Sequence, residues 1–161
     1  MGNDSRASCA EITFYESTNS AEQRAEDEKE SYTLKIGSNE IKSHKGGVEK
    51  TSKIDVAPYI AGAGYTLIPL RGLLEEMGAT IEWNGDIQQI IIEKEGTFIE
   101  MQIMYRSVYI IDPKGKEVRY TLNEPPRIKD SRTFIPVRFI SEQLGYNVAW
   151  NGETKEITIT K

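Results

Sequence analysis

The sequence predicts an α+β fold made of two repeated units, each an antiparallel β-sheet with one short α-helix packed on it. The first observation behind this prediction is an internal repeat, because the stretch 66–94 is written again at 133–161 with twelve of twenty-nine aligned positions identical. The second is periodicity, since apolar residues in each copy alternate as in a strand, recur at the helical period, and alternate again. The third is the matching placement of proline and glycine. A repeat of this size predicts two small units, 32–96 and 97–161, that share a core.

Residues 1–31 are predicted to form a disordered, acidic leader. They hold eight acidic and three basic residues, which accounts for the whole net charge of −5, while the remaining 130 residues carry seventeen of each sign. Because no basic face is available to attract phosphates, nucleic acid is not expected as a partner. No apolar run approaches the roughly 20 residues of a membrane-spanning helix, and no signal peptide is visible in the chain.

The first elements of each copy are predicted to be strands. The alternating run 32–36 predicts one strand, and the arms of a hairpin follow at 40–43 and 48–56, joined by a Gly-Gly pair. After a loop, each copy continues with a short strand, at 66–68 or 133–135. The second copy repeats the earlier strands at 98–103, 108–111 and 116–122.

One short helix is expected in each copy, directly after the short strand. Pro69 and Pro136 end those strands, and proline fits the first turn of a helix. The apolar residues that follow recur at i, i+3, i+4 and i+7, the stripe of a helix lying on a sheet. These residues are Leu70, Leu73, Leu74 and Met77 in the first copy and Val137, Ile140 and Leu144 in the second. Gly78 and Gly145 are predicted to end the helices as left-handed caps.

A second hairpin closes each copy. The extended segments 80–83 and 147–150 end in Asn-Gly, a strong hairpin signal, and the return strands are predicted at 88–94 and 155–161. Only two residues, Glu95 and Gly96, separate the copies. The last strand of the first copy should therefore turn directly into the first strand of the second, with the two sheets continuous or tightly apposed.

The repeated pattern resembles the copper amine oxidase N-terminal-like domain, also called the stalk domain, in two tandem copies. The resemblance rests on Ile68-Pro69-Leu70-Arg71 with Gly78 and Trp83, and on Ile135-Pro136-Val137-Arg138 with Gly145 and Trp150. It implies a non-catalytic structural or binding module of the bacterial cell surface or envelope, extracellular or on the cell surface. It implies neither catalytic residues nor a cofactor.

Two Arg-Glu pairs are the first candidates for a special role. Arg71 with Glu75, and Arg138 with Glu142, are four residues apart on the predicted helices, so each pair can meet. A structural role is favoured, in which the guanidinium ties the start of the helix to strand carbonyls and to the glutamate. The alternative is a site for an anion or carboxylate ligand.

Aromatic residues supply the candidate binding surface. Burial in the core is favoured for Trp83 and Trp150, and an exposed platform for sugar rings is the alternative. Tyrosine and arginine are enriched at binding surfaces, so any contact surface is expected on the second copy. Its candidate residues are Tyr105, Tyr109, Tyr120 and Arg119. The expected partner is a cell-wall polymer, a polysaccharide or another surface protein.

Catalysis and metal binding are not expected. His44 and Cys9 are the only histidine and cysteine, too few for a copper or zinc site or for a nucleophilic triad, and a single cysteine excludes a disulfide within the chain. A hydrolase with paired carboxylates is the weakest alternative, because arginine neighbours favour the ionised forms of Glu75 and Glu142. A non-catalytic module is therefore the leading interpretation, with carbohydrate or cell-wall polymer binding as the alternative.

Overall fold

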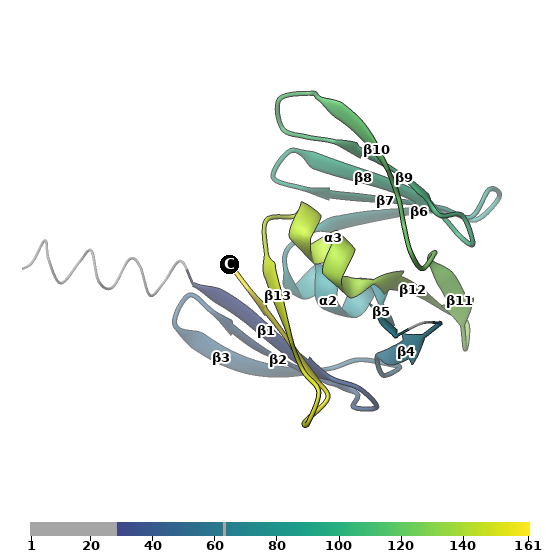
Figure 1. The fold of residues 1–161 in the computed structure, drawn as a ribbon. Helices are drawn as coiled ribbons and strands as arrows, with labels where there is room; N and C mark the ends of the chain where they lie inside the picture. The colour runs from purple at the N-terminus through teal and green to yellow at the C-terminus, as the bar shows by residue number, and fades with distance from the viewer. Residues whose placement is uncertain (1–28, 63) are drawn as a thin grey trace, which may run out of the picture.

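The computed structural model describes residues 29–62 and 64–161. These residues form two five-stranded antiparallel sheets, one four-stranded sheet and two short helices (Figure 1). The large sheets lie at the top and bottom of Figure 1, with the helices and the small sheet between them. The predictions made for residues 1–28, which include Cys9, fall outside the described part of the chain.

One large sheet takes its strands from both ends of the chain. Its order is β13 (Asn147–Asn151), β14 (Glu156–Thr160), β1 (Glu30–Lys35), β2 (Glu40–Lys45) and β3 (Val48–Lys53). The pairing of β1 with β14 sets Tyr32 opposite Ile159 and Leu34 opposite Ile157, and all four side chains are buried. Alternation along each strand thus places one apolar face against the core. β1 already begins at Glu30, inside the predicted leader.

The other large sheet is formed by five strands that are consecutive in the sequence. Its order is β10 (Glu117–Thr121), β9 (Ser107–Ile111), β8 (Thr97–Gln102), β7 (Gln89–Lys94) and β6 (Thr80–Asn84). β7 turns directly into β8 through Glu95 and Gly96, as predicted, and the pairing sets Ile92 opposite Ile99. Glycine suits this turn because Gly96 has a φ of +87°.

The small sheet lies between the other two and has the order β11 (Arg127–Lys129), β12 (Arg132–Pro136), β5 (Tyr65–Pro69), β4 (Tyr59–Ala61). Its central pair is β5 with β12, where Ile68 faces Ile135. The sequence pattern assigned the segments of β4 and β11 to loops. Both strands have only three residues, which is too short for an alternating pattern to be recognised.

Both predicted helices are present. α2 (Leu70–Glu76) follows Pro69, and α3 (Val137–Gln143) follows Pro136. Gly78 and Gly145 come after the helix ends with φ of +85° and +93°, the left-handed conformation predicted for them. Leu70, Leu73 and Leu74 of α2 and Val137, Ile140 and Ser141 of α3 are buried. One apolar cluster joins both helices to the inner faces of both large sheets.

The strand pairing differs from the prediction that each repeat forms its own sheet. Each five-stranded sheet combines three strands from one half of the chain with two from the other. The apolar alternation identifies a strand and its buried face, but it does not select the partner strand. Among the described residues, no helix has the length and apolar character needed to cross a membrane.

Candidate functional site

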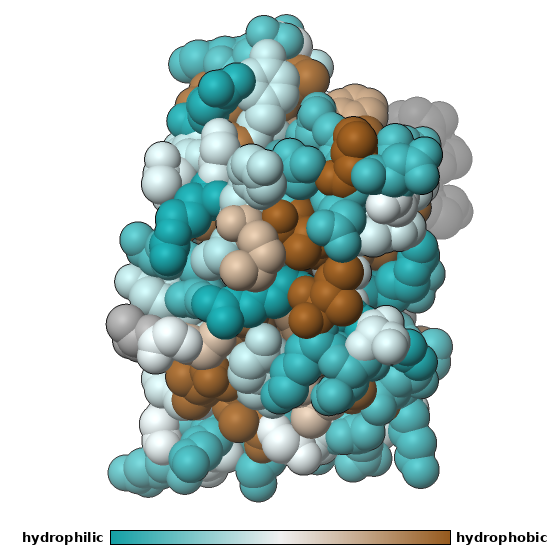
Figure 2. Space-filling model, turned by 90° about the vertical axis from the view of Figure 1, so that its right-hand side faces the viewer, coloured by the Kyte–Doolittle hydropathy of each residue, from teal (hydrophilic) through white to brown (hydrophobic). Residues whose placement is uncertain are grey.

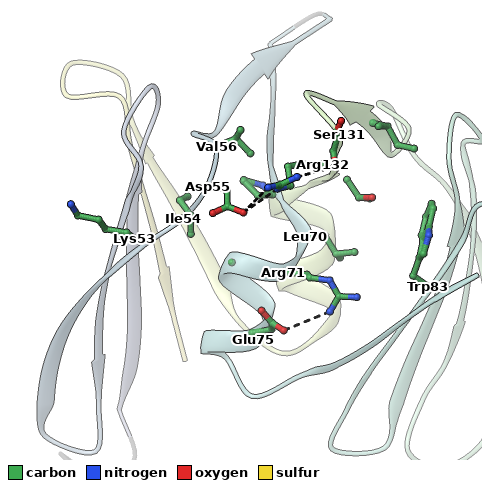
Figure 3. A pocket seen from close by; sticks show the side chains of 14 residues that line it. Lys53, Ile54, Asp55, Val56, Leu70, Arg71, Glu75, Trp83, Ser131 and Arg132 are labelled. Atoms are coloured by element: carbon green, nitrogen blue, oxygen red, sulfur yellow. Dashed lines mark hydrogen bonds and ion pairs between the residues drawn. The ribbon is translucent and has the colours of Figure 1, made fainter. Parts of the chain in front are cut away.

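One groove, the α2 groove, lies beside helix α2 and has a volume of about 580 Å³ (Figure 3). Its lining comes from α2 and β6, from the end of β3 and the segment after it, from the end of β5, and from the β11–β12 hairpin. The side chains that define it here are Ile54, Leu70, Arg71, Glu75, Trp83 and Arg132. Trp83 faces Leu70 and Arg71 across the groove in Figure 3.

The second groove, the α3 groove, lies beside helix α3 and has a volume of about 520 Å³. It is defined here by Tyr65, Val137, Arg138, Phe139, Glu142 and Trp150. In the repeat alignment, Arg138, Glu142 and Trp150 are the equivalents of the arginine, glutamate and tryptophan of the α2 groove. The two grooves therefore share one set of side chains at matching positions.

The two tryptophans are exposed at these grooves, so the prediction of burial was wrong. Trp83 and Trp150 keep 40% and 42% of their surface accessible. The cause is strand position, because β6 and β13 are edge strands, each with a neighbouring strand on one side only. The nitrogen edge of each indole lies beside the glycine of the Asn-Gly turn, where a Cβ on Gly85 would lie 3.4 Å from Trp83 Nε1 and one on Gly152 would lie 3.6 Å from Trp150 Nε1.

The Arg-Glu pairs form as expected from their spacing, but at the surface. Arg71 Nη1 lies 3.6 Å from Glu75 Oε2, and Arg138 Nη1 lies 3.7 Å from Glu142 Oε2, with all four side chains at least half exposed. Arg138 Nη1 also donates a hydrogen bond to the carbonyl of Val148 at 3.1 Å. Both arginines therefore face solvent within a groove.

Each carboxylate that lines a groove has an arginine partner. In the α2 groove, Arg132 donates two hydrogen bonds to Asp55 Oδ2, at 3.1 and 2.9 Å, alongside the Arg71 and Glu75 pair. In the α3 groove, the buried Glu124 pairs with Arg127, alongside Arg138 and Glu142. The lining carboxylate groups are therefore already engaged with guanidinium groups.

The tyrosines of the second copy do not come together. Tyr105 is 59% exposed in the β8–β9 turn. Tyr109 shares the outer sheet face with Arg119, whose guanidinium carbon lies 5.8 Å from the ring centroid. A hydrogen bond to Glu117 raises the pKa of Tyr109. Tyr120 is on the inner face, where its ring packs edge-to-face on Phe139 at 5.5 Å. None of these candidates lines either groove.

The sequence reasoning did not single out Ile54, Tyr65 or Phe139, and it did not bring Asp55 and Arg132 together. The latter two are 77 positions apart and meet only because the β11–β12 turn lies beside the segment after β3. The available signal was the repeat itself, since Arg132 and Tyr65 both stand one residue before the repeated stretch, and each lines a groove. Within residues 29–62 and 64–161, no three His, Cys, Asp or Glu side chains are grouped so that they could hold a metal ion.

The surface also carries isolated apolar residues. On the face shown in Figure 2, hydrophobic side chains form several separate groups among hydrophilic ones and not one continuous patch. Single exposed apolar residues are ordinary at protein surfaces and do not by themselves mark a docking face. The grooves, with paired charges beside half-exposed indoles, are therefore the stronger candidate sites.

Comparison with known proteins gives one family. The model of the copper amine oxidase N-terminal domain matches residues 47–159, which include both helices, both tryptophans and both Arg-Glu pairs. The match spans this region as a single stretch and does not mark two copies. A search of the curated proteins finds no match.

Proposed function

Because the chain belongs to the copper amine oxidase N-terminal domain family, a family of non-catalytic domains, we propose that it is a binding module of the bacterial cell envelope that holds a polysaccharide. The envelope location follows the resemblance of the repeated pattern to modules of exported and cell-surface proteins. The polysaccharide is proposed from the lining of the two grooves.

The main support for polysaccharide binding is the partial exposure of the indoles of Trp83 and Trp150 in the grooves. These two rings differ from the singly exposed apolar residues because they occupy the same position of the repeat and each lines a groove. Sugar rings offer flat faces of C–H groups that pack on an indole, and they offer hydroxyl groups around the rim. Each tryptophan faces apolar residues of its helix as well as charged ones, which suits both parts of such a ligand.

The paired charges beside each indole suit the hydroxyl groups. An Arg-Glu pair presents donors and acceptors together, and hydrogen bonds that involve a charged partner are the stronger ones. The α2 groove adds a second such pair, Arg132 with Asp55. Since the two signs are nearly balanced in each groove, the lining suits a neutral, hydroxyl-rich polymer better than a strongly charged one.

A hydrolase is disfavoured by the same pairs. Glycoside hydrolysis commonly needs two carboxyl groups that flank the scissile bond and are available to it. The lining carboxylates Asp55, Glu75, Glu124 and Glu142 each have an arginine partner. The expected activity is therefore association with the polymer, without turnover.

The test is binding to purified bacterial cell wall, to a soluble β-1,4-glucan and to a soluble polymer of N-acetylglucosamine. We expect wild-type protein to bind at least one of them and to release no sugar on long incubation. The double variant Trp83→Ala/Trp150→Ala should lose binding, because truncating a central aromatic typically costs about 2 kcal/mol, roughly 30-fold in Kd, at each site.

The control is Tyr105→Ala, which removes a ring that is more exposed than either tryptophan but lies outside both grooves. This variant should bind like wild type. Loss of binding in Tyr105→Ala with retention in the double variant would move the site to the turns of the β6–β10 sheet. Failure of wild type to bind any envelope polymer would favour a spacer role instead.

A further inference from the structure

The central sheet relates the two grooves to each other. β5 and β12 pair antiparallel with Ile68 opposite Ile135, and these residues occupy equivalent positions of the repeated stretch. The flanking pairs obey the same symmetry, because Phe134 faces Pro69 and Pro136 faces Leu67. Antiparallel strands paired at equivalent positions are related by a local two-fold rotation. The helix that follows each strand, and its groove, must then lie on opposite sides of this axis.

The strand order places the grooves at opposite edges of the molecule. β3 and β6 are edge strands of the two large sheets, and they give Lys53 and Trp83 to the α2 groove. β10 and β13 are the opposite edge strands, and they give Thr121 and Trp150 to the α3 groove. In Figure 1, β10, β13 and α3 lie toward the viewer, whereas β3, β6 and α2 fade behind them. The two grooves therefore open on opposite faces.

From this arrangement we propose that one chain binds two polysaccharide strands at once, one in each groove, and so joins them. The proposal rests on the proposed function and adds the number and placement of the sites. A single strand is a poor fit for both grooves, because the shared apolar core fills the space between them. Going around the outside would take a strand across a five-stranded sheet, about 19 Å from edge to edge at about 4.8 Å per strand spacing.

The two sites are matched but not identical. Gly72 of α2 corresponds to Phe139 of α3, and a Cβ at Gly72 would lie 2.5 Å from Ile54 Cγ2, so this groove has no room for an aromatic ring there. The α3 groove instead carries Phe139 and Tyr65, whereas the α2 groove carries Arg132 in the place of that tyrosine. We therefore expect one class of ligand at both sites, with unequal affinities.

The test measures the number of binding sites per chain and the ability of the protein to join polymer strands. It uses the polysaccharide that wild-type protein binds. Calorimetry with a short oligosaccharide of that polymer should give two sites per chain for wild type and one site for Trp83→Ala and for Trp150→Ala. Light scattering should show that wild-type protein increases the apparent mass of the soluble polymer, with a maximum at an intermediate ratio of protein to polymer. Either single variant should bind the polymer without increasing its mass.

The apparent affinity for insoluble polymer is a second measurement. Neighbouring strands are held close together in such a polymer, so both grooves of one chain can bind at the same time. Each single variant should then lose roughly 10²-fold in apparent affinity, although one groove remains intact. The Tyr105→Ala variant is the matched control and should behave as wild type in all three experiments. Urea unfolding of each variant verifies that the fold is retained, and a Trp→Phe change at the same position should restore joining in part.

The outcomes separate this inference from the proposed function. One site per chain in wild type, lost completely in one tryptophan variant and unaffected in the other, would overturn the inference and leave a module with a single groove. Joining that persists in both single variants would also overturn it, because it would then arise from association between chains. Absence of any binding by wild type would instead remove the proposed function.

Discussion

The contribution of an ion pair to the free energy of unfolding depends on its exposure to solvent. Exposure therefore decides how much Arg71 and Arg138 stabilise the fold. Their guanidinium groups lie 3.6 and 3.7 Å from the paired glutamates, and their side chains are 59% and 56% exposed. Water screens such charges, and holding two long side chains in one geometry costs conformational entropy. A large loss of stability, as a buried pair would show, is therefore not expected at either site.

We predict that Arg71→Ala and Arg138→Ala each lower the free energy of unfolding by less than about 1 kcal/mol. Arg138→Ala should cost more than Arg71→Ala, because Arg138 also donates a hydrogen bond to the carbonyl of Val148. Urea unfolding followed by circular dichroism measures both changes. A loss of more than about 3 kcal/mol, the size found when one partner of a buried pair is removed, would contradict the surface positions of these side chains.

The two tryptophans show that the average burial of a residue type does not predict the burial of an individual residue. Tryptophan is highly buried on average, and that average favoured the core for both Trp83 and Trp150. Whether an inner-face residue is covered depends on whether its strand has a neighbour on each side, and β6 and β13 have one neighbour each. Strand order is a property of the whole sheet. Local sequence therefore predicted the inward direction of these rings but not their exposure.

At the level of elements, a shared carboxylate connects β1 to the segment between α3 and β13. Tyr32 and Tyr146 each donate a hydrogen bond to Glu30 Oε2, at 2.9 and 2.8 Å, and their rings meet edge-on at 6.2 Å. Both rings are buried. Burial, together with the hydrogen bond to Glu30, raises the pKa of both tyrosines. The neutral hydroxyl groups therefore stabilise the contact between the first strand and the last hairpin.

The raised pKa values predict a loss of stability at alkaline pH. A tyrosine in the unfolded chain loses its proton near pH 10, while the folded form holds it to higher pH, so the stabilisation is complete below pH 10 and decreases above it. Between pH 9 and pH 11, each of these tyrosines should remove roughly 1 kcal/mol from the free energy of unfolding. We predict that Tyr146→Phe loses about that much less than wild type over this interval.

Urea unfolding at the two pH values gives this comparison, since the two proteins differ only in the hydroxyl group at position 146. Tyr105→Phe is the control, because its ring is exposed in the β8–β9 turn. It should lose as much stability as wild type. An equal loss in wild type and Tyr146→Phe would contradict a raised pKa of Tyr146 in the folded protein.

The elements with local signals were predicted well from sequence. Pro69 and Pro136 mark the helix starts, and Gly78 and Gly145 mark their ends, because proline and glycine act through backbone geometry that no distant contact alters. Segments without such signals were missed. β4 and β11 are held by pairing to β5 and β12, and a strand of three residues has no period of its own.

At the scale of the whole molecule, the two halves of the chain exchange strands. β1 of the first half pairs with β14 of the second, and β7 of the first half pairs with β8 of the second. The buried faces of these strands belong to one apolar cluster that includes both helices. The internal repeat predicted two sets of similar elements, and it could not distinguish separate sheets from shared ones because both satisfy the same alternation of apolar residues.

Shared sheets predict that neither half folds alone. A fragment of residues 29–96 would lack β14 and β8, so β1 and β7 would each lose one neighbouring strand. A fragment of residues 97–161 would lack β1 and β7, so β14 and β8 would each lose one neighbouring strand. In both fragments the apolar faces of these strands would be exposed to water. At this size a chain buries only about 60% of its unfolded surface even when its sheets are complete. We predict that each fragment lacks a cooperative urea transition, whereas an equimolar mixture recovers the dispersed amide NMR spectrum of the intact 29–161 chain. A cooperative transition in either fragment alone would contradict this and would support two independent units.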